Sequence, residues 1–342
     1  MSTSAKERSY SRGKRAGVIG AGSWGTALAL VLERLGYEVG LWVYEPELAE
    51  RIRDEHENAV FLPGFPLGSG ISPTTKLVEA VGPLTVVATP SHALRTTLSR
   101  LQPVLPPAGE ILLATKGLEE QTCLRVSEVA VDVLGEGVGR RLATLSGPTF
   151  AREVAAGEPA AVVLASHAPE LARSLQKRMA SSSLRLYTSE DVIGVELAAS
   201  LKNVIAIASG ICTGLGLGSN TQAALIARGL AEMSRLAIAM GGQAETLAGL
   251  AGLGDLVLTC TGALSRNRAL GIALGQGKTL AEAQAATPMV AEGVRTTAAG
   301  VLLAKRWGVE MPILAQMHRV LFEHLTPRRA LSELMTRALK AE

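Results

Sequence analysis

The sequence has few aromatic residues and few cysteines. Phe, Trp and Tyr together make up 3% of its 342 residues, so Ala, Val, Ile and Leu must fill the core. Its three cysteines, Cys123, Cys212 and Cys260, stand far apart and show no paired spacing. This spacing argues against a disulfide framework and against a zinc site, and it fits a reducing, cytoplasmic compartment. We expect three buried free thiols and no metal site.

An excess of charge of one sign is missing as well. Lys and Arg number 34 and Asp and Glu number 31, which leaves a formal net charge of +3, and both kinds alternate along most of the chain. A nucleic-acid-binding protein needs a concentrated basic face, so we expect no nucleic-acid partner. Local basic residues can still serve one small anionic substrate.

Long hydrophobic runs free of polar residues are also absent. The most hydrophobic stretch, residues 192–212, contains Glu196, Lys202 and Asn203. Ionised groups at that depth argue against a membrane span. Residues 1–15 are polar and basic and lack the apolar core of a secretory signal, so we expect a disordered tail there.

The length of the chain predicts two domains. The first half alternates helical segments, such as residues 26–35, with short apolar runs. Strands are expected at residues 16–19, 38–44, 84–88, 110–114, 143–145 and 160–164. Such runs are typical of a parallel sheet covered on both faces, and prolines 63, 66, 73, 83, 103, 106 and 107 are expected in the loops between them. After about residue 191, strand signals give way to Ala- and Leu-rich helices. We predict a Rossmann-like, doubly wound α/β domain at 16–191 and an all-helical substrate domain at 192–342.

A glycine turn, Gly20-Ala21-Gly22-Ser23-Trp24-Gly25, follows the first expected strand and opens a helix. In a dinucleotide-binding fold the first glycine permits the tight turn, the second lets a pyrophosphate approach the backbone, and the third lets helix and strand pack closely. Free N–H groups at the start of the helix would then meet the phosphates. The turn therefore predicts a dinucleotide-binding site.

The choice between NAD and NADP stays open. An acidic residue about 20 positions after the glycines would bind the ribose 2′-hydroxyl of NAD, and an arginine would accept a 2′-phosphate. Glu45 lies 25 residues after Gly20, and Arg51 and Arg53 follow it closely. Tyr44 is placed to stack on the adenine.

Ligands of a doubly wound sheet bind beyond the carboxyl ends of its strands. Three polar loops meet that description: residues 89–92, 115–117 and 146–149. Lys116 directly follows a strand and is a candidate ligand-binding residue, with an ordinary surface lysine as the alternative. His92 is better explained as an ordinary surface residue.

Lys202 is the most informative single residue. Its helical neighbours are small or apolar, so it is expected to be desolvated. Burial disfavours the ammonium form and brings the pKa of a lysine toward neutrality, where it can serve as a general acid or base. The alternative is a lysine that extends along the helix to water. Glu196 lies on a different helical face and is expected to be a structural ion-pair partner.

Three further segments carry candidate polar residues. Asp255 follows glycines that leave the backbone free, and it either positions Lys202 or caps a helix. Ser265-Arg266-Asn267-Arg268 is an anion-binding candidate, because a guanidinium suits phosphate and Ser and Asn add neutral donors; a solvated loop is the alternative. Glu292 stands among apolar residues and needs a partner, which a hydroxyl-rich cofactor would supply.

Taken together, these residues resemble the bacterial-type NAD(P)-dependent glycerol-3-phosphate dehydrogenases. The resemblance covers about residues 16 to 335 in the right order, and the motifs are highly specific as a set. The matching segments are VIGAGSWGTA (18–27), ATKGLE (114–119), SGPTFA (146–151), LKNVIAI (201–207), RGLAEMSRL (228–236), AGLGDLVLTC (251–260), SRNR (265–268) and VEMPI (309–313).

The resemblance implies interconversion of dihydroxyacetone phosphate and sn-glycerol 3-phosphate, mainly toward the latter for phospholipid synthesis, by a homodimer. It implies that Lys202 is the proton donor and acceptor. The implied substrate contacts are Lys116, Gly147, Thr149, Asp255, Ser265, Arg266 and Asn267. The implied cofactor contacts are Ser23, Trp24, Tyr44, Ala151, Val290 and Glu292, with Lys116 and Arg266 shared; the family varies at Tyr44.

Two rival functions share part of this pattern. A β-hydroxyacid dehydrogenase would have the glycine turn, the helical domain and the helix lysine, but its carboxylate substrate would leave Ser265, Arg266 and Asn267 without a purpose. A dinucleotide sensor without enzymatic activity would not need Lys202 or Asp255.

Overall fold

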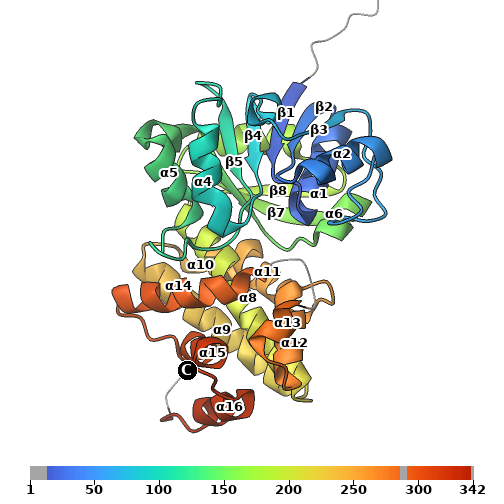
Figure 1. Ribbon diagram of the computed structural model, residues 1–342. Helices are drawn as coiled ribbons and strands as arrows, with labels where there is room; N and C mark the ends of the chain where they lie inside the picture. The colour runs from blue at the N-terminus through green and yellow to red at the C-terminus, as the bar shows by residue number, and fades with distance from the viewer. Residues whose placement is uncertain (1–13, 286–290, 340–342) are drawn as a thin grey trace, which may run out of the picture.

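The computed structural model describes residues 14–285 and 291–339. A sheet with helices on both of its faces forms one domain, and a group of helices packs against one end of it (Figure 1). This is the predicted fold class. The last strand ends at Ser189 and the long helix of the second domain begins at Val192, while the exact domain boundary stays a prediction.

The described residues form one eight-stranded sheet in the order β3-β2-β1-β4-β5-β6-β7-β8. Its strands are β1 Lys14–Ile19, β2 Tyr37–Trp42, β3 Ile71–Thr74, β4 Leu84–Val87, β5 Glu110–Leu113, β6 Leu142–Ser146, β7 Ala160–Ala165 and β8 Leu184–Ser189. Neighbouring strands are parallel, with the exception that β7 runs antiparallel to β6. The expectation of a parallel sheet is thus right for most of the sheet and wrong for this pair.

Both edge strands were absent from the sequence prediction. β3 contains Pro73, which was expected in a loop; at the edge of a sheet its missing N–H removes no hydrogen bond from the ladder. β8 alternates buried Leu184 and Leu186 with exposed residues, so it lacks the continuous apolar run of the central strands. The first strand begins earlier than expected. β1 begins at Lys14, so Lys14 and Arg15, the last two residues of the expected tail, belong to a strand. Residues 1–13 of that tail lie outside the described residues.

Helices cover the sheet on both faces. They are α1 Ser23–Arg34, α2 Pro46–Glu55, α3 Leu77–Ala80, α4 Ser91–Leu101, α5 Val126–Leu134, the 3₁₀ helix η1 Glu136–Arg141, α6 Ala151–Ala156 and α7 Pro169–Met179. Val18 and Val86 belong to the apolar core on one face, and their strand neighbours Ile19 and Val87 belong to the core on the other. Burial on both faces explains why these strands consist of continuous apolar runs.

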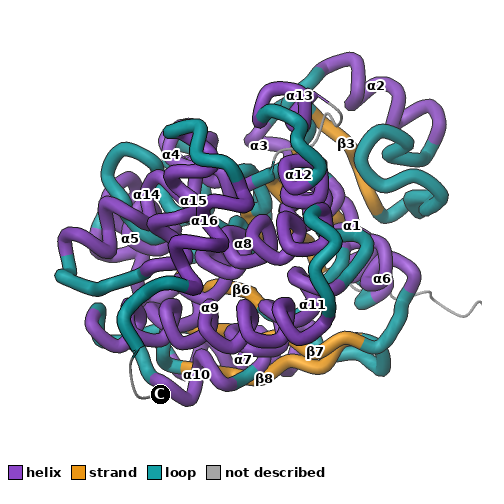
Figure 2. Tube along the Cα trace, turned by 90° about the horizontal axis from the view of Figure 1, so that it is seen from below, coloured by secondary structure: helices purple, strands orange, loops and turns teal. Residues whose placement is uncertain are grey.

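The second domain is helical throughout its described residues. Its elements are α8 Val192–Gly214, α9 Ser219–Ala239, α10 Ala244–Ala248, the π-helix η2 Leu250–Gly254, α11 Asp255–Thr261, α12 Arg266–Gly275, α13 Leu280–Ala285, α14 Glu292–Arg306, α15 Pro312–Phe322 and α16 Pro327–Met335. Figure 2 shows α8 in the middle of this domain. α8 has the length and hydropathy of a membrane span, but 94% of its most apolar window is buried inside the protein. It is the central core helix.

Glycines allow α8 and α12 to touch along their backbones. A Cβ added at Gly210 would lie 2.1 Å from the carbonyl oxygen of Arg268, and one added at Gly271 would lie 2.0 Å from that of Ile207. Because α12 begins at Arg266, this close contact sets the place of the Arg266 loop relative to α8.

Candidate active site

A cluster of charged groups forms where the carboxyl edge of the sheet meets the helical domain. Lys116 comes from the loop after β5, Lys202 from α8, and Asp255 from the first residue of α11. Lys202 Nζ lies 2.5 Å from Asp255 Oδ1, and Lys116 Nζ lies 3.1 Å from Asp255 Oδ2. Lys116 Nζ also donates to the carbonyl oxygen of Gly147 at 3.5 Å. One carboxylate therefore joins two lysines from different domains.

The side chain of Lys202 is buried. The residue is 5% exposed, which rules out the alternative of a lysine extended to water. Burial lowers the pKa of Lys202 to about 7, Asp255 opposes this shift, and Lys116 reinforces it. The ammonium and amine forms are therefore both available near neutral pH, as a general acid or base requires.

Asp255 is not the N-cap of its helix. The N-cap position of α11 is Gly254, and the Asp255 side chain, fully buried, instead faces the two lysines. Buried charge is tolerated only when it is paired, and here two cations compensate one anion. The cluster carries a surplus of one positive charge when both lysines are protonated, which suits an anionic substrate.

Thr259 is a member of the cluster that sequence reasoning missed. It is buried, its hydroxyl accepts from Lys202 Nζ at 3.1 Å, and it donates to the Asp255 carbonyl oxygen at 2.6 Å. The signal in the sequence was that Thr259 follows Asp255 by four residues, since residues four apart on a helix lie on the same face.

At the start of α12, Ser265 and Asn267 bond to other parts of the protein, whereas Arg266 is exposed. Ser265 is the N-cap of α12, where its hydroxyl oxygen accepts from the Arg268 N–H. Asn267 is buried; its amide nitrogen donates to Asn203 Oδ1 at 3.0 Å and its oxygen accepts from the Gly293 N–H at 2.9 Å. Although part of the Arg266 side chain is exposed, neighbouring protein atoms desolvate its guanidinium and lower its pKa. The nearby Glu292 carboxylate opposes that shift.

The glycine turn has the form that a dinucleotide requires. Gly20 has φ +111°, in the region that favours glycine, and a Cβ on Gly25 would lie 1.8 Å from the Gly20 carbonyl oxygen. A Cβ on Gly22 would meet nothing within 4 Å, so the space beside it is open. This open backbone at the start of α1 fits a pyrophosphate. Helix α1 begins at Ser23, three residues before the expected start.

The sheet domain also carries the predicted cofactor contacts Ser23, Trp24, Tyr44 and Ala151. Trp24 is half-buried, Ser23 donates to the Phe61 carbonyl oxygen at 2.7 Å, and Ala151 opens α6. Tyr44 is 69% exposed just beyond β2, with its ring edge-on to Trp42 at 6.0 Å. Val290 lies outside the described residues.

Glu292 has a partner that the sequence did not reveal. The Ser91 hydroxyl, at the start of α4, donates to Glu292 Oε2 at 2.8 Å across the two domains. Thr149 is half-buried beside Gly147 and donates to its carbonyl oxygen at 3.2 Å. His92 is exposed and joins none of these contacts, in keeping with its interpretation as a surface residue.

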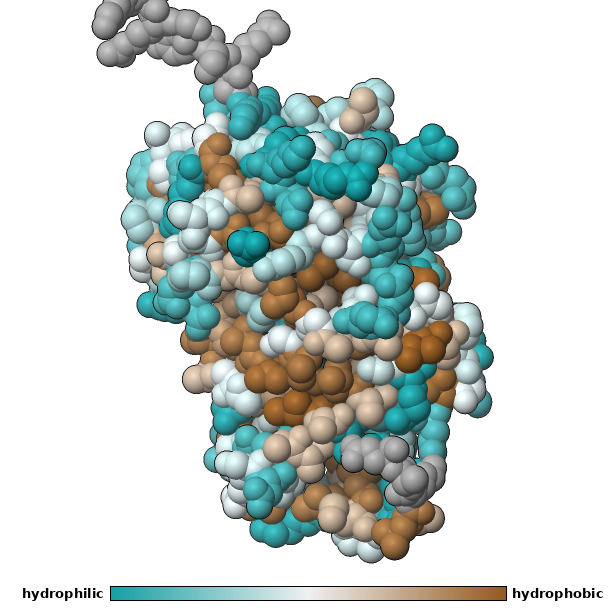
Figure 3. Space-filling view, turned by 180° about the vertical axis from the view of Figure 1, so that it is seen from behind, coloured by the Kyte–Doolittle hydropathy of each residue, from teal (hydrophilic) through white to brown (hydrophobic). Residues whose placement is uncertain are grey.

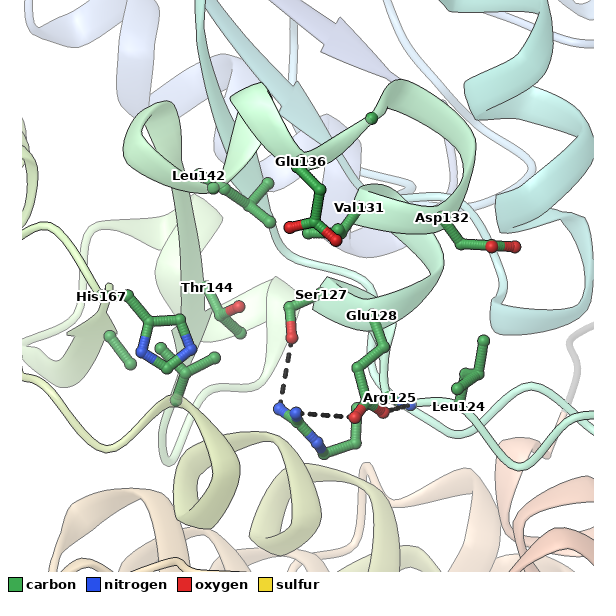
Figure 4. A pocket seen from close by; sticks show the side chains of 14 residues that line it. Leu124, Arg125, Ser127, Glu128, Val131, Asp132, Glu136, Leu142, Thr144 and His167 are labelled. Carbon is green, nitrogen blue, oxygen red and sulfur yellow. Dashed lines mark hydrogen bonds and ion pairs between the residues drawn. The ribbon is translucent and has the colours of Figure 1, made fainter.

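A cavity of about 540 Å³ lies elsewhere, between α5, η1, β6 and the start of α8 (Figure 4). None of the predicted site residues lines it. Cys123, Cys212 and Cys260 are free and buried, as expected. In the described parts of the chain, no group of three or more His, Cys, Asp or Glu could hold a metal ion.

Comparison with known proteins accounts for both domains. The family models for the N-terminus and the C-terminus of NAD-dependent glycerol-3-phosphate dehydrogenase match residues 15–172 and 191–332. A protein of Geobacter sp. (strain M21) named glycerol-3-phosphate dehydrogenase [NAD(P)+] is 53% identical over 95% of this chain and 98% of its own length. A protein of the same name from Geobacter sulfurreducens is 52% identical over 96% and 99%.

Solved structures agree with these sequence relatives. A crystal structure of glycerol-3-phosphate dehydrogenase from Coxiella burnetii superposes with a TM-score of 0.90 at 43% identity, covering 95% of this chain and 99% of that one. A ketopantoate reductase from Ralstonia eutropha has a TM-score of 0.58 at 18% identity, covering 93% and 99%, which shows the shared fold alone. The chain therefore belongs to the NAD-dependent glycerol-3-phosphate dehydrogenase family and is an NAD(P)-dependent oxidoreductase.

Proposed function

We propose that this enzyme reduces dihydroxyacetone phosphate to sn-glycerol 3-phosphate, reversibly, with Lys202 as the general acid. The observation that carries this proposal is the buried contact between Lys202 Nζ and Asp255, with a lysine pKa of about 7. When bound, NAD(P)H supplies the hydride that the ketone carbon receives. The Lys202 ammonium gives its proton to the oxygen of that carbon, where negative charge develops, and in the reverse direction the amine takes the proton back.

Asp255 holds Lys202 in place from the opposite side. Its second oxygen holds Lys116, which we assign to both substrate and cofactor. Gly147 and Thr149, at the end of β6, complete this side of the substrate site. Two lysines against one carboxylate favour an anionic ligand, because each ammonium keeps donors that Asp255 does not occupy.

The phosphate of the substrate is assigned to Ser265, Arg266 and Asn267. Arg266 is exposed, and its planar fork suits phosphate oxygens. Asn267 gives one of its two amide hydrogens to Asn203, so the other is left for the ligand. Binding at this loop orients the reacting carbon without taking part in the chemistry.

The cofactor is assigned to the open glycine turn and its surroundings. Gly20, Gly22 and Gly25, with Ser23 and Trp24, would hold the pyrophosphate at the start of α1. Tyr44 would stack on the adenine. The remaining assigned contacts are Lys116, Ala151, Arg266, Val290 and Glu292. NADH and NADPH both fit this proposal.

One spectrophotometric assay separates this function from its rivals. Consumption of NADH and of NADPH is followed with dihydroxyacetone phosphate and, separately, with short keto acids. We expect turnover with the phosphorylated ketone. Turnover with the keto acids alone would point to a β-hydroxyacid dehydrogenase, and cofactor binding without turnover would point to a sensor.

The setting of the reaction is part of the same proposal. We place the enzyme in the cytoplasm, as a homodimer that supplies glycerol 3-phosphate for phospholipid synthesis. Figure 3 displays apolar side chains gathered on the helical domain just below the sheet domain. The exposed apolar side chains of this domain include Leu253, Val257 and Leu264, in or beside α11. Sedimentation of the purified chain tests the dimer; a monomer at micromolar concentration would contradict it.

A further inference from the structure

Glu196 is a buried carboxylate outside the substrate cluster. It lies on α8, six residues before Lys202, and is 2% exposed. Its Oε2 accepts from Arg125 Nη1 at 2.8 Å and from the Ser127 hydroxyl at 2.7 Å. Its Oε1 accepts from the Ser127 N–H at 3.1 Å and from the Thr144 hydroxyl at 2.8 Å. Burial raises the pKa of Glu196, and Arg125 opposes that shift.

All of these partners belong to the sheet domain. Arg125 and Ser127 stand at the start of α5 and Thr144 lies in β6, whereas Glu196 belongs to the central helix of the other domain. Figure 4 shows Arg125, Ser127 and Thr144 beside the cavity, with Arg125 directed to both Ser127 and Glu128. The contacts of Glu196 therefore join α8 to the sheet at one level of the helix.

A buried ion pair adds little net stability, because desolvating the charges offsets their attraction. Its geometric effect is larger. Six residues along a helix correspond to about 9 Å, so the point where α8 is attached to the sheet lies close to Lys202. The glycine turn assigned to the cofactor pyrophosphate belongs to the sheet domain and Lys202 belongs to α8. The docking of α8 on the sheet therefore sets the distance between that turn and Lys202.

We propose that Glu196 is a positioning residue that holds α8 in register against β6 and α5, and thereby aligns Lys202 with the reacting carbon. This inference rests on the proposed role of Lys202. The requirement is for a carboxylate: the Arg125 and Ser127 N–H groups are fixed donors that act on different oxygens. A glutamine would turn its amide N–H₂ toward one of them, whichever way its side chain is placed.

Glu232 provides a matched control. It is a buried glutamate on α9, 3% exposed, and it accepts from the Ile313 N–H at 2.7 Å and the Leu314 N–H at 3.3 Å. These contacts stay within the helical domain. Glu232→Gln therefore removes buried carboxylate bonds without touching the link between α8 and the sheet.

The test measures kcat, KM and the primary deuterium isotope effect on kcat, using NAD(P)H deuterated at the transferred position and dihydroxyacetone phosphate. For Glu196→Gln we expect kcat to fall about 10- to 100-fold, because small misplacements of reacting groups have effects of that size. The isotope effect should rise as hydride transfer becomes slower, and the KM for cofactor should change little. Thr144→Val removes one bond without changing shape and should shift kcat and isotope effect in the same direction, by about 3-fold in kcat. Glu232→Gln should leave both unchanged.

Two results would overturn the inference. One is a folded Glu196→Gln enzyme with the kcat and isotope effect of the parent. The other is a kcat loss that accompanies a lower melting temperature while the isotope effect stays constant. A smaller folded fraction alone would produce that combination. If Glu196→Gln does not fold, the Thr144→Val variant decides by the same criteria. Failure of the proposed function is recognised separately, because it would leave Lys202→Ala active.

Discussion

Asp255→Asn should move the pH dependence of reduction to lower pH. Burial and Lys116 both favour the neutral amine of Lys202, and Asp255 is the group that opposes them. Two unit charges about 4 Å apart interact by about 4 kcal/mol at an effective dielectric constant of 20, and about 1.4 kcal/mol corresponds to a tenfold change in protonation. The maximum shift is therefore about 3 pH units. The substitution also removes the carboxylate partner of Lys116, so Lys116 can move away from Lys202, and we expect about 1 to 2 of these pH units.

The sign follows from the protonation state that each direction needs. In the proposed mechanism reduction requires the Lys202 ammonium, so in the parent enzyme its kcat should fall as pH rises through the Lys202 pKa of about 7. In Asp255→Asn this fall occurs at lower pH, and at pH 7 only about 1–10% of the enzyme carries the proton. By the same mechanism, oxidation of glycerol 3-phosphate requires the Lys202 amine, so its kcat should rise over the same pH range. In the variant this rise should begin at lower pH.

Initial rates in both directions, from about pH 5 to pH 9, provide the measurement. Asp132→Asn is the control: it removes a carboxylate that is 56% exposed and paired with Arg95 on the surface, so it should leave both profiles unchanged. An Asp255→Asn profile with the parent midpoint, or one moved to higher pH, would refute the electrostatic reasoning.

Three further substitutions test other parts of the site. Lys202→Ala should retain cofactor binding, measured by fluorescence titration, and lose about 10²- to 10⁴-fold in turnover; near-parental turnover would disprove the general-acid role. Arg266→Ala should raise the KM for dihydroxyacetone phosphate, because the exposed guanidinium is the assigned phosphate ligand, and an unchanged KM would count against it. Gly271→Ala should destabilise the protein by about 1–3 kcal/mol in urea, because its Cβ would lie 2.0 Å from the Ile207 carbonyl oxygen. Gly139→Ala, where a Cβ meets nothing within 4 Å, is the control, and equal stability of the two variants would contradict the packing argument.

Local patterns predicted the central strands and missed the edges. The central strands are buried on both faces, so their apolar runs stand out in the sequence. β3 and β8 lie at the edges, where a proline and exposed residues are tolerated. The antiparallel direction of β7 had no sequence signal, because an apolar run has the same composition in either direction.

The sequence by itself determined the glycine turn, the apolar face around Lys202 and the two-domain order, because each depends on residues close together in the chain. The tertiary structure decided which side chains these residues contact. Lys116 and Asp255 are 139 residues apart, Ser91 and Glu292 are 201 apart, and no periodicity relates them. The pKa of Lys202 was decided there too, since burial and charge from separate segments set it together. Electrostatic effects depend on distance in space, which only the folded chain defines.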